Sequence, residues 1–220
     1  MRTKTLLAVA AIGAAGIASS LAQSNVYSLN VVGYVNVAYK AGFNAAANPL
    51  VGSPDNTLNT VMAGAAVPDN TIVFTWDTTA QDFSGVLPTF VASSGTWDPN
   101  IAIPQGQGIF VLAPSDFTNT FVGEVKQGST TTAIDPGFNG IASPVPIGGD
   151  TATVLTGMVA SDNDLAFKWD TTTQDFGAIA TYILSSTTWD PIVNWQVGEG
   201  IFYLSQAGST VNWVRNFTVQ

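Results

Sequence analysis

The sequence contains neither cysteine nor histidine among its 220 residues. Without cysteine there can be no disulfide and no lipid-anchored bacterial lipoprotein, so core packing and hydrogen bonds must stabilise the fold. Without histidine the chain lacks the commonest metal ligand and the commonest general base, which excludes Ser-His and Cys-His catalysis. The two glutamates, Glu124 and Glu199, have no counterpart in the internal repeat described below. The sequence therefore predicts a protein that is not an enzyme and that holds no cofactor and no catalytic metal.

Charged residues are also scarce, at 10% of the chain against a usual ~25%. Asp and Glu number 15 and Lys and Arg number 6, so the formal net charge is −9. Nucleic acids and anionic membrane surfaces are excluded as partners, because binding them requires clustered Lys and Arg. The hydrophobic content of 46% excludes a disordered polymer.

The N-terminus has the pattern of a secretory signal peptide. Arg2 and Lys4 precede the apolar run 6–18, and Ser20 to Ala22 places small residues at a cleavage site. The run is shorter than the ~20 residues that span a bilayer, and no later stretch is long enough, so we expect no membrane span in the mature protein. We predict cleavage after Ala22 and a secreted or cell-surface location, with the periplasm as the alternative. An uncleaved anchor is the competing interpretation.

Most of the chain after the signal is an internal duplication with a period of roughly 90 residues. The ordered matches indicate two tandem modules with small insertions in loops. The matched segments are 42–44 with 137–139, 48–49 with 143–144, 74–79 with 167–172, 81–83 with 174–176, 96–99 with 188–191, and 106–110 with 198–202.

Alternation and turn residues predict a mainly β fold of two tandem homologous modules, each with one short helix. Segments 70–76 and 83–91 read as a hairpin, and 109–112 and 121–125 as further strands. Asp55 and Asp150 are the expected helix N-caps. We place module 1 at 23–125, a polar linker at 126–136 and module 2 at 137–220. A single domain of two packed halves is the alternative.

The strand-like segment 31–37 resembles the segments that close each module, 122–125 and 214–217. Three such segments bracket only two modules, so one strand is left over if each module has one. Its backbone N–H and C=O groups still need hydrogen-bond partners. We expect it to pair with 121–125 in its own module. The alternative is addition to the edge of a neighbouring molecule.

The ordered motifs, from Gly-Phe-Asn through the Trp-Asp hairpin to Gly-x-Gly-Ile-Phe, resemble repeats of uncharacterised secreted proteins of Verrucomicrobia-type bacteria. They are also distantly similar to the GWN-LIS and GKGYW repeats of bacterial surface proteins. Phe43 and Phe138 replace the Trp of that second pattern, and no Lys lies between the glycines. The resemblance covers Val31 to the C-terminus and implies a surface or extracellular role without a mechanism.

Repeated Trp-Asp pairs are the candidate ligand-binding residues. Exposed tryptophans could stack on sugar rings while the aspartates accept hydroxyl hydrogen bonds; the competing interpretation is core tryptophan beside a turn-capping aspartate. The pairs are Trp76 and Asp77, Trp97 and Asp98, Trp169 and Asp170, and Trp189 and Asp190.

Two further motifs have structural interpretations. Asp77 with Asp82, and Asp170 with Asp175, could contribute to a Ca²⁺ site, but no complete loop pattern accompanies them and turn formation is favoured. Each Gly-x-Gly lacks the third glycine, the helix and the lysine of a phosphate loop, and predicts a turn or bulge.

The sequence as a whole predicts a non-catalytic exported structural or interaction protein of the cell surface or extracellular matrix. Its expected partners are a second copy or another surface protein. The alternative is a carbohydrate-binding protein with a glycan partner, and a third, weaker hypothesis is an acid-acting hydrolase that uses pairs of aspartates.

Overall fold

A computed structural model describes residues 31–64 and 66–219, and the predicted signal peptide 1–22 lies outside this part of the chain. The described chain is mainly β, as predicted, with two four-residue helices. Residues 31–220 form one compact unit. Within it we call residues 32–124 the first half and residues 128–217 the second half.

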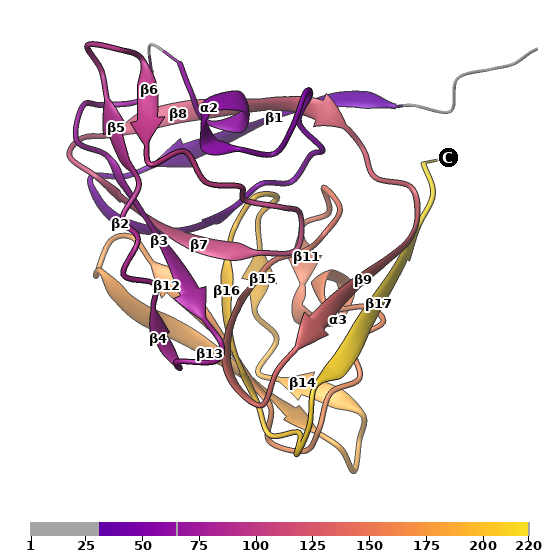
Figure 1. The fold of residues 1–220 in the computed structure, drawn as a ribbon. Helices are drawn as coiled ribbons and strands as arrows, with labels where there is room; N and C mark the ends of the chain where they lie inside the picture. The colour runs from indigo at the N-terminus through magenta and orange to yellow at the C-terminus, as the bar shows by residue number, and fades with distance from the viewer. Residues whose placement is uncertain (1–30, 65, 220) are drawn as a thin grey trace, which may run out of the picture. The chain divides into compact units, whose positions relative to one another are not determined.

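The first half combines a six-stranded β-sheet with a two-stranded antiparallel ribbon (Figure 1). The strands of the sheet are in the order β2-β7-β3-β5-β6, with β4 paired to β3. The ribbon pairs β1 with β8. The elements are β1 (Val32–Tyr39), β2 (Gly42–Ala47), α2 (Leu58–Val61), β3 (Ile72–Asp77), β4 (Asp82–Phe83), β5 (Thr89–Val91), β6 (Thr96–Asp98), β7 (Gly108–Ala113) and β8 (Phe117–Glu124).

The second half has a matching order of pairing. Its five-stranded sheet has the order β10-β16-β12-β13-β14. Its ribbon pairs β9 with β17, and β11 pairs separately with β15. Superposition of the two halves stays a prediction. The elements are β9 (Gly128–Ile134), β10 (Gly137–Ile141), β11 (Gly149–Asp150), α3 (Thr151–Val154), β12 (Leu165–Asp170), β13 (Asp175–Ile183), β14 (Thr188–Asp190), β15 (Asn194–Trp195), β16 (Ile201–Ser205) and β17 (Val211–Phe217).

The N-terminal strand pairs within its own half, as expected. β1 is antiparallel to β8 over eight positions, from Val32 opposite Glu124 to Tyr39 opposite Phe117. The segment 126–136, expected to be a linker, instead contains β9, which pairs with β17 from Gly128 to Ile134. Each ribbon therefore has two strands, and within residues 31–64 and 66–219 every strand has a partner.

The predicted helices are present, but only one has the expected cap. Asp150 is the N-cap of α3, and its carboxylate accepts a hydrogen bond from the Thr153 N–H at 2.7 Å. In the first half Thr57, not Asp55, is the N-cap residue of α2. Asp55 instead accepts hydrogen bonds from Thr57 and Thr60, forming a polar turn ahead of the helix.

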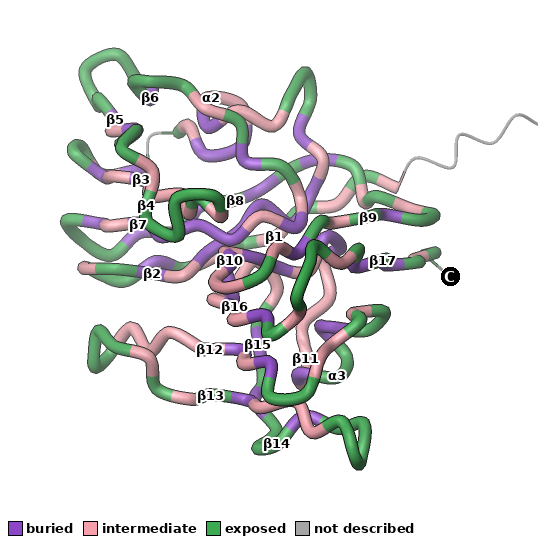
Figure 2. Tube along the Cα trace, turned by 60° about the horizontal axis from the view of Figure 1, so that its bottom comes forward, coloured by how far each residue is buried: buried purple, intermediate pink, exposed green. Residues whose placement is uncertain are grey.

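Each half encloses its own apolar core, and the loop tips are exposed (Figure 2). The first core lies between the six-stranded sheet, the β1–β8 ribbon and α2. Tyr39 belongs to it and stacks on Phe117 with ring centroids 4.6 Å apart. Burial raises the pKa of the Tyr39 hydroxyl.

Replacing Tyr39 by phenylalanine is expected to stabilise the protein. The hydroxyl is buried and has no hydrogen-bond partner among the described residues. An unsatisfied buried polar group costs about 1–3 kcal/mol, so we expect Tyr39→Phe to raise the free energy of unfolding by about 1 kcal/mol, measured by urea denaturation. Tyr203→Phe is the control and should be neutral or destabilising, because that hydroxyl donates to Asp164 at 2.6 Å. A loss of stability in Tyr39→Phe would contradict the prediction.

Candidate functional site

The duplicated hairpins place aromatic side chains on the surfaces where the two halves meet. In the first half Trp76 on β3 is directly opposite Phe83 on β4. In the second half Trp169 on β12 is opposite Phe176 on β13, next to an irregularity in the register between Lys168 and Trp169. Cross-strand neighbours on one face of a ribbon lie together, so each hairpin presents a Trp-Phe pair.

The two tryptophans make reciprocal contacts with the opposite half. The Trp76 indole N–H donates to the carbonyl of Phe138, and the Trp169 indole N–H donates to that of Phe43, both at 2.8 Å. Their rings also contact the opposite half edge-on, Trp76 against Phe202 at 4.8 Å. The equivalent distance between Trp169 and Phe110 is 5.3 Å.

A glutamine in each hairpin turn binds the same phenylalanine backbone. Gln81 accepts from the Phe138 N–H at 2.7 Å and donates to its carbonyl at 3.1 Å. Gln174 does the same to Phe43, at 2.6 and 3.1 Å. The preceding glycine, Gly137 or Gly42, has a positive φ, and a Cβ there would collide with the glutamine amide. The Gly-Phe-Asn motif is therefore a docking point for the other half.

The Gly-x-Gly motifs also lie where the halves meet. The carbonyls of Gly106 and Gly198 accept hydrogen bonds from Ala142 and Ala47 of the opposite half, each at 2.9 Å. Gly106 and Gly198 have positive φ values of 88° and 80°. The predicted turns are thus present, and they bring the backbones of the two halves into hydrogen-bonding contact.

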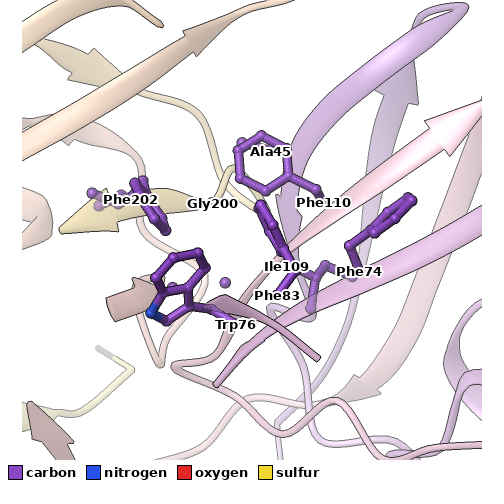
Figure 3. Close-up of a pocket in the computed structure, with 11 residues that line it drawn as sticks. Ala45, Phe74, Trp76, Phe83, Ile109, Phe110, Gly200 and Phe202 are labelled. Atoms are coloured by element: carbon purple, nitrogen blue, oxygen red, sulfur yellow. The ribbon is translucent and has the colours of Figure 1, made fainter. Parts of the chain in front are cut away.

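Between the halves the aromatic residues line an open cleft of about 360 Å³, which we call the aromatic cleft. Every lining residue is aromatic, and both halves contribute. A second hollow of about 10 Å³ shares Trp76, Phe110 and Phe202 with the cleft (Figure 3) and is also lined by Gly108, Gly140 and Gly200. The lining residues of the cleft are Phe43, Phe74, Trp76, Phe83, Phe110, Phe138, Trp169, Phe176 and Phe202.

Each hairpin also pairs two aspartates beside its turn, on the strand face opposite the Trp-Phe pair, and none of these aspartates lines the cleft. Asp77 is opposite Asp82, one position beyond the Trp76–Phe83 pair, and Asp170 is opposite Asp175 in the same relation to Trp169. The backbone N–H groups of Thr172 and Thr173 hold the pKa of Asp170 below its ordinary value. The nearby Lys168 ammonium forms an ion pair with Glu199 at 2.8 Å.

The predicted Trp-Asp residues separate into two groups. Trp76 and Trp169 line the aromatic cleft, while Trp97 and Trp189 belong to the two separate cores. Trp97 is only 2% exposed and donates its indole N–H to the Met62 carbonyl at 2.7 Å. A sugar ring has no access to Trp97, whereas Trp189, at 9% exposure, lines a separate hollow of about 340 Å³ together with Tyr182 and Ile192.

The aspartates of the same motifs do not converge on one site. Asp77 accepts hydrogen bonds from the N–H groups of Thr79 and Ala80, and Asp170 from those of Thr172 and Thr173, which are turn-capping contacts. Asp98 and Asp190 are exposed at the ends of β6 and β14, on the hairpins whose tryptophans are buried. In the described ranges no group of three or more acidic side chains is placed to hold a metal ion.

Sequence reasoning identified Trp76 and Trp169 but not the phenylalanines and glutamines around them. The phenylalanines and glutamines recur at matching positions of the two repeats, and this recurrence is the signal in the sequence that could have identified them. What the motif could not show is that each one contacts the opposite half.

No protein-family description, no curated protein and no solved structure matches this chain significantly. Within residues 31–64 and 66–219, no helix combines the length and apolar character needed to cross a membrane.

Proposed function

We propose that the protein is a non-catalytic exported interaction protein that binds an apolar organic group of its partner in the aromatic cleft. The observation that carries the proposal is the open cleft of about 360 Å³ lined only by aromatic rings from both halves. Open apolar surface of this kind, rimmed by polar residues, is typical of binding sites.

Two features of the chain support an extracellular role. The N-terminal sequence has the pattern of an export signal, and the chain has few charged residues and turns rich in Thr, Ser, Asn and Gln. The repeated turns are used for contacts between the halves, which gives the cleft a fixed frame. A binding surface assembled from two docked halves is well suited to a structural or adhesive role outside the cytoplasm.

The carbohydrate alternative has weaker support from the geometry. Trp76 and Trp169 offer ring faces, but their indole N–H groups already donate to Phe138 and Phe43. No hydrogen-bonding side chain other than these indoles lines the cleft. Sugar hydroxyls buried there would lose their hydrogen bonds to water without replacement, which is costly.

Binding of the neutral apolar dye N-phenyl-1-naphthylamine tests the proposal. We expect its fluorescence to rise on binding to the mature protein, and its affinity to fall at least tenfold in the Phe83→Ser, Phe176→Ser double variant. Phe83 is 42% exposed, so removing its ring changes the cleft more than the cores. Light scattering with and without dye measures whether a second copy fills the cleft instead.

Tyr34→Ser is the matched control, because Tyr34 is 74% exposed and lies on β1 outside the cleft. It should bind the dye like the wild type. Equal dye affinity in all three proteins, or none in the wild type, would show that the cleft is not a binding surface. Binding of neutral oligosaccharides on a glycan array, lost in the double variant, would favour the carbohydrate alternative.

A further inference from the structure

The second half has a hollow of about 340 Å³ that shares no lining residue with the aromatic cleft. We call it the Trp189 hollow. It is lined by residues of α3, by Tyr182 and Trp189 on β13 and β14, and by Ile192 just beyond β14. Its volume lies within the ~300–1,000 Å³ range of small-molecule sites, which makes it a second candidate binding site.

The duplication provides a matched aromatic pair in the first half. Tyr182 is opposite Trp189 across β13 and β14, as Phe90 is opposite Trp97 across β5 and β6. The ring centroids are 5.2 and 5.4 Å apart, with tilts of 58° and 59°. Phe90 and Trp97 are each only 2% exposed, whereas Trp189 is 9% exposed and Tyr182 is half-buried. The same pair is therefore closed in the first half and lines a hollow in the second.

The pair in the second half also has polar groups without partners. In the first half the Trp97 indole N–H donates to the Met62 carbonyl at 2.7 Å, and Phe90 has no hydroxyl. Within residues 31–64 and 66–219 the Trp189 indole N–H and the Tyr182 hydroxyl make no hydrogen bond, and neither atom is sealed from solvent. The structure thus leaves one donor and one hydroxyl for a ligand at this place.

Thr187 lines the hollow with a backbone conformation that threonine rarely adopts. Its φ is 55°, in the left-handed region that a β-branched side chain disfavours. The matching residue in the first half is Gly95, which has φ 68° and adopts this conformation without strain. Strained residues persist mainly where their side chains serve a site. The second half therefore keeps a hydroxyl beside the hollow at a position where the first half has glycine.

The lining combines apolar surface with hydrogen-bonding groups and carries little charge. Ile192, which is 70% exposed, and Met158 are apolar, while Thr187 adds a hydroxyl to that of Tyr182. Asp150 is the one charged residue among the described residues that line the hollow, and no lysine or arginine is there to attract an anion. A purely apolar guest would cover the free N–H and hydroxyl groups without replacing their hydrogen bonds to water.

A cation also gains little, because the Asp150 carboxylate already accepts the Thr153 N–H at 2.7 Å. A peptide that adds a strand would find only three residues, Thr188–Asp190, on the edge strand β14. The guest that remains is neutral, has apolar C–H groups on one side and carries hydroxyls that both donate and accept hydrogen bonds.

We propose that the Trp189 hollow binds a neutral sugar residue of a glycan. The indole N–H of Trp189 donates to a sugar hydroxyl oxygen, and the hydroxyls of Tyr182 and Thr187 donate to or accept from neighbouring sugar hydroxyls. The C–H groups of the sugar pack against Ile192 and Met158. This site lies apart from the aromatic cleft and does not depend on the proposed function.

The first measurement screens the mature protein on an array of neutral hexose and N-acetylhexosamine oligosaccharides, with sialylated and sulfated glycans beside them. Isothermal titration calorimetry with the neutral oligosaccharide that binds most strongly then gives the affinity. We expect this affinity to change little at 1 M NaCl, because salt screens charges and the guest has none. Absence of binding to every neutral oligosaccharide, or binding of anionic glycans alone, would overturn the inference.

Variants of the aromatic pair test the two free polar groups. Trp189→Phe keeps an aromatic ring in the core but removes the indole N–H, and it should weaken the sugar at least tenfold. Tyr182→Phe removes the hydroxyl and should weaken it several-fold. Trp97→Phe is the matched control in the first half: it loses the hydrogen bond to Met62, so it should lower the melting temperature and leave sugar affinity unchanged.

Exposed positions keep the test valid if a core variant unfolds. Ile192→Ser should weaken the sugar several-fold without loss of the fold, because Ile192 is 70% exposed. Thr187→Gly should weaken the sugar and raise the melting temperature, because glycine relieves the strain at φ 55°. A purely structural role of Thr187 would change the melting temperature alone. Circular dichroism checks that every variant is folded.

The outcomes separate this inference from the proposed function. The Phe83→Ser, Phe176→Ser double variant should bind the sugar like the wild type, because neither residue lines the Trp189 hollow. Sugar binding lost in that double variant but retained in folded Trp189→Phe would place the sugar in the aromatic cleft and overturn the inference. Absence of dye binding with sugar binding intact would overturn the proposed function alone.

Discussion

Replacing Gly108 and Gly200 together by valine is expected to separate the two halves. A Cβ on Gly108 would collide with the Ile141 backbone, and one on Gly200 would lie 2.7 Å from the Ala46 carbonyl oxygen. Both neighbours are backbone atoms of the opposite half and cannot turn away as a flexible side chain does. Overpacking costs about 1–3 kcal/mol at each site, so we expect a loss of about 2–6 kcal/mol in urea denaturation.

The same variant should change the environment of Trp76 and Trp169, because both indoles donate to carbonyls of the opposite half. We expect tryptophan emission to shift to longer wavelength and the cleft to lose the apolar dye. Gly85→Val is the control, since nothing lies within 4 Å of the added Cβ. Unchanged stability and emission in the double variant would show that the close approach of the two backbones does not hold the halves together.

Deleting residues 23–37 is expected to abolish the cooperative unfolding transition of the first half. The deletion removes most of β1, whose residues face β8 at eight positions. Val35 and Val37 also pack against the first core. The backbone groups of β8 would lose their partners along most of the strand, a loss comparable with the 5–15 kcal/mol total stability of a typical domain.

Thermal unfolding followed by circular dichroism, together with light scattering, measures this effect. Deleting only residues 23–30 is the control, because β1 begins at Val32; it should retain most of the stability. A melting temperature and oligomeric state unchanged by the longer deletion would mean that the strand is only a tether. An increase in oligomers would indicate that the exposed edge of β8 pairs with another molecule.

The two predictions also bear on function, because the aromatic cleft exists only while the halves are docked. Gln81 and Gln174 reach across to Phe138 and Phe43, and the tryptophans beside them line the cleft. A variant that weakens docking should therefore weaken binding even when it lies outside the cleft. Measuring dye affinity and stability on the same set of glycine variants tests this coupling.

The sequence by itself determined the local elements, because their signals are local. Alternation and β-branched residues mark the strands, and the polar turn 77–82 marks the hairpin that joins β3 to β4. Asp150 marks the start of α3. The spacing of similar closing segments indicated an extra strand at 31–37, the lower entropic cost of local pairing favoured 121–125 as its partner, and β1 pairs with β8.

The strand within segment 126–136 could not be predicted from its local sequence. Its polar residues resembled a linker, yet Thr130, Thr132 and Ile134 on β9 alternate toward the second core. The partner strand β17 lies at the far end of the chain, from Val211 to Phe217. A strand whose partner is so distant is not identified by its own composition.

Only the tertiary structure decided which tryptophans are core and which line the cleft. Trp76 and Trp97 are each followed by Asp in a similar hairpin, so their local sequences do not distinguish them. Trp97 lies in the first core, where its indole reaches the residue that follows α2, whereas Trp76 reaches the second half. Periodicity tells which residues share a face but not what covers that face. Here the covering surface is the other half of the chain, and docking of the halves creates the aromatic cleft.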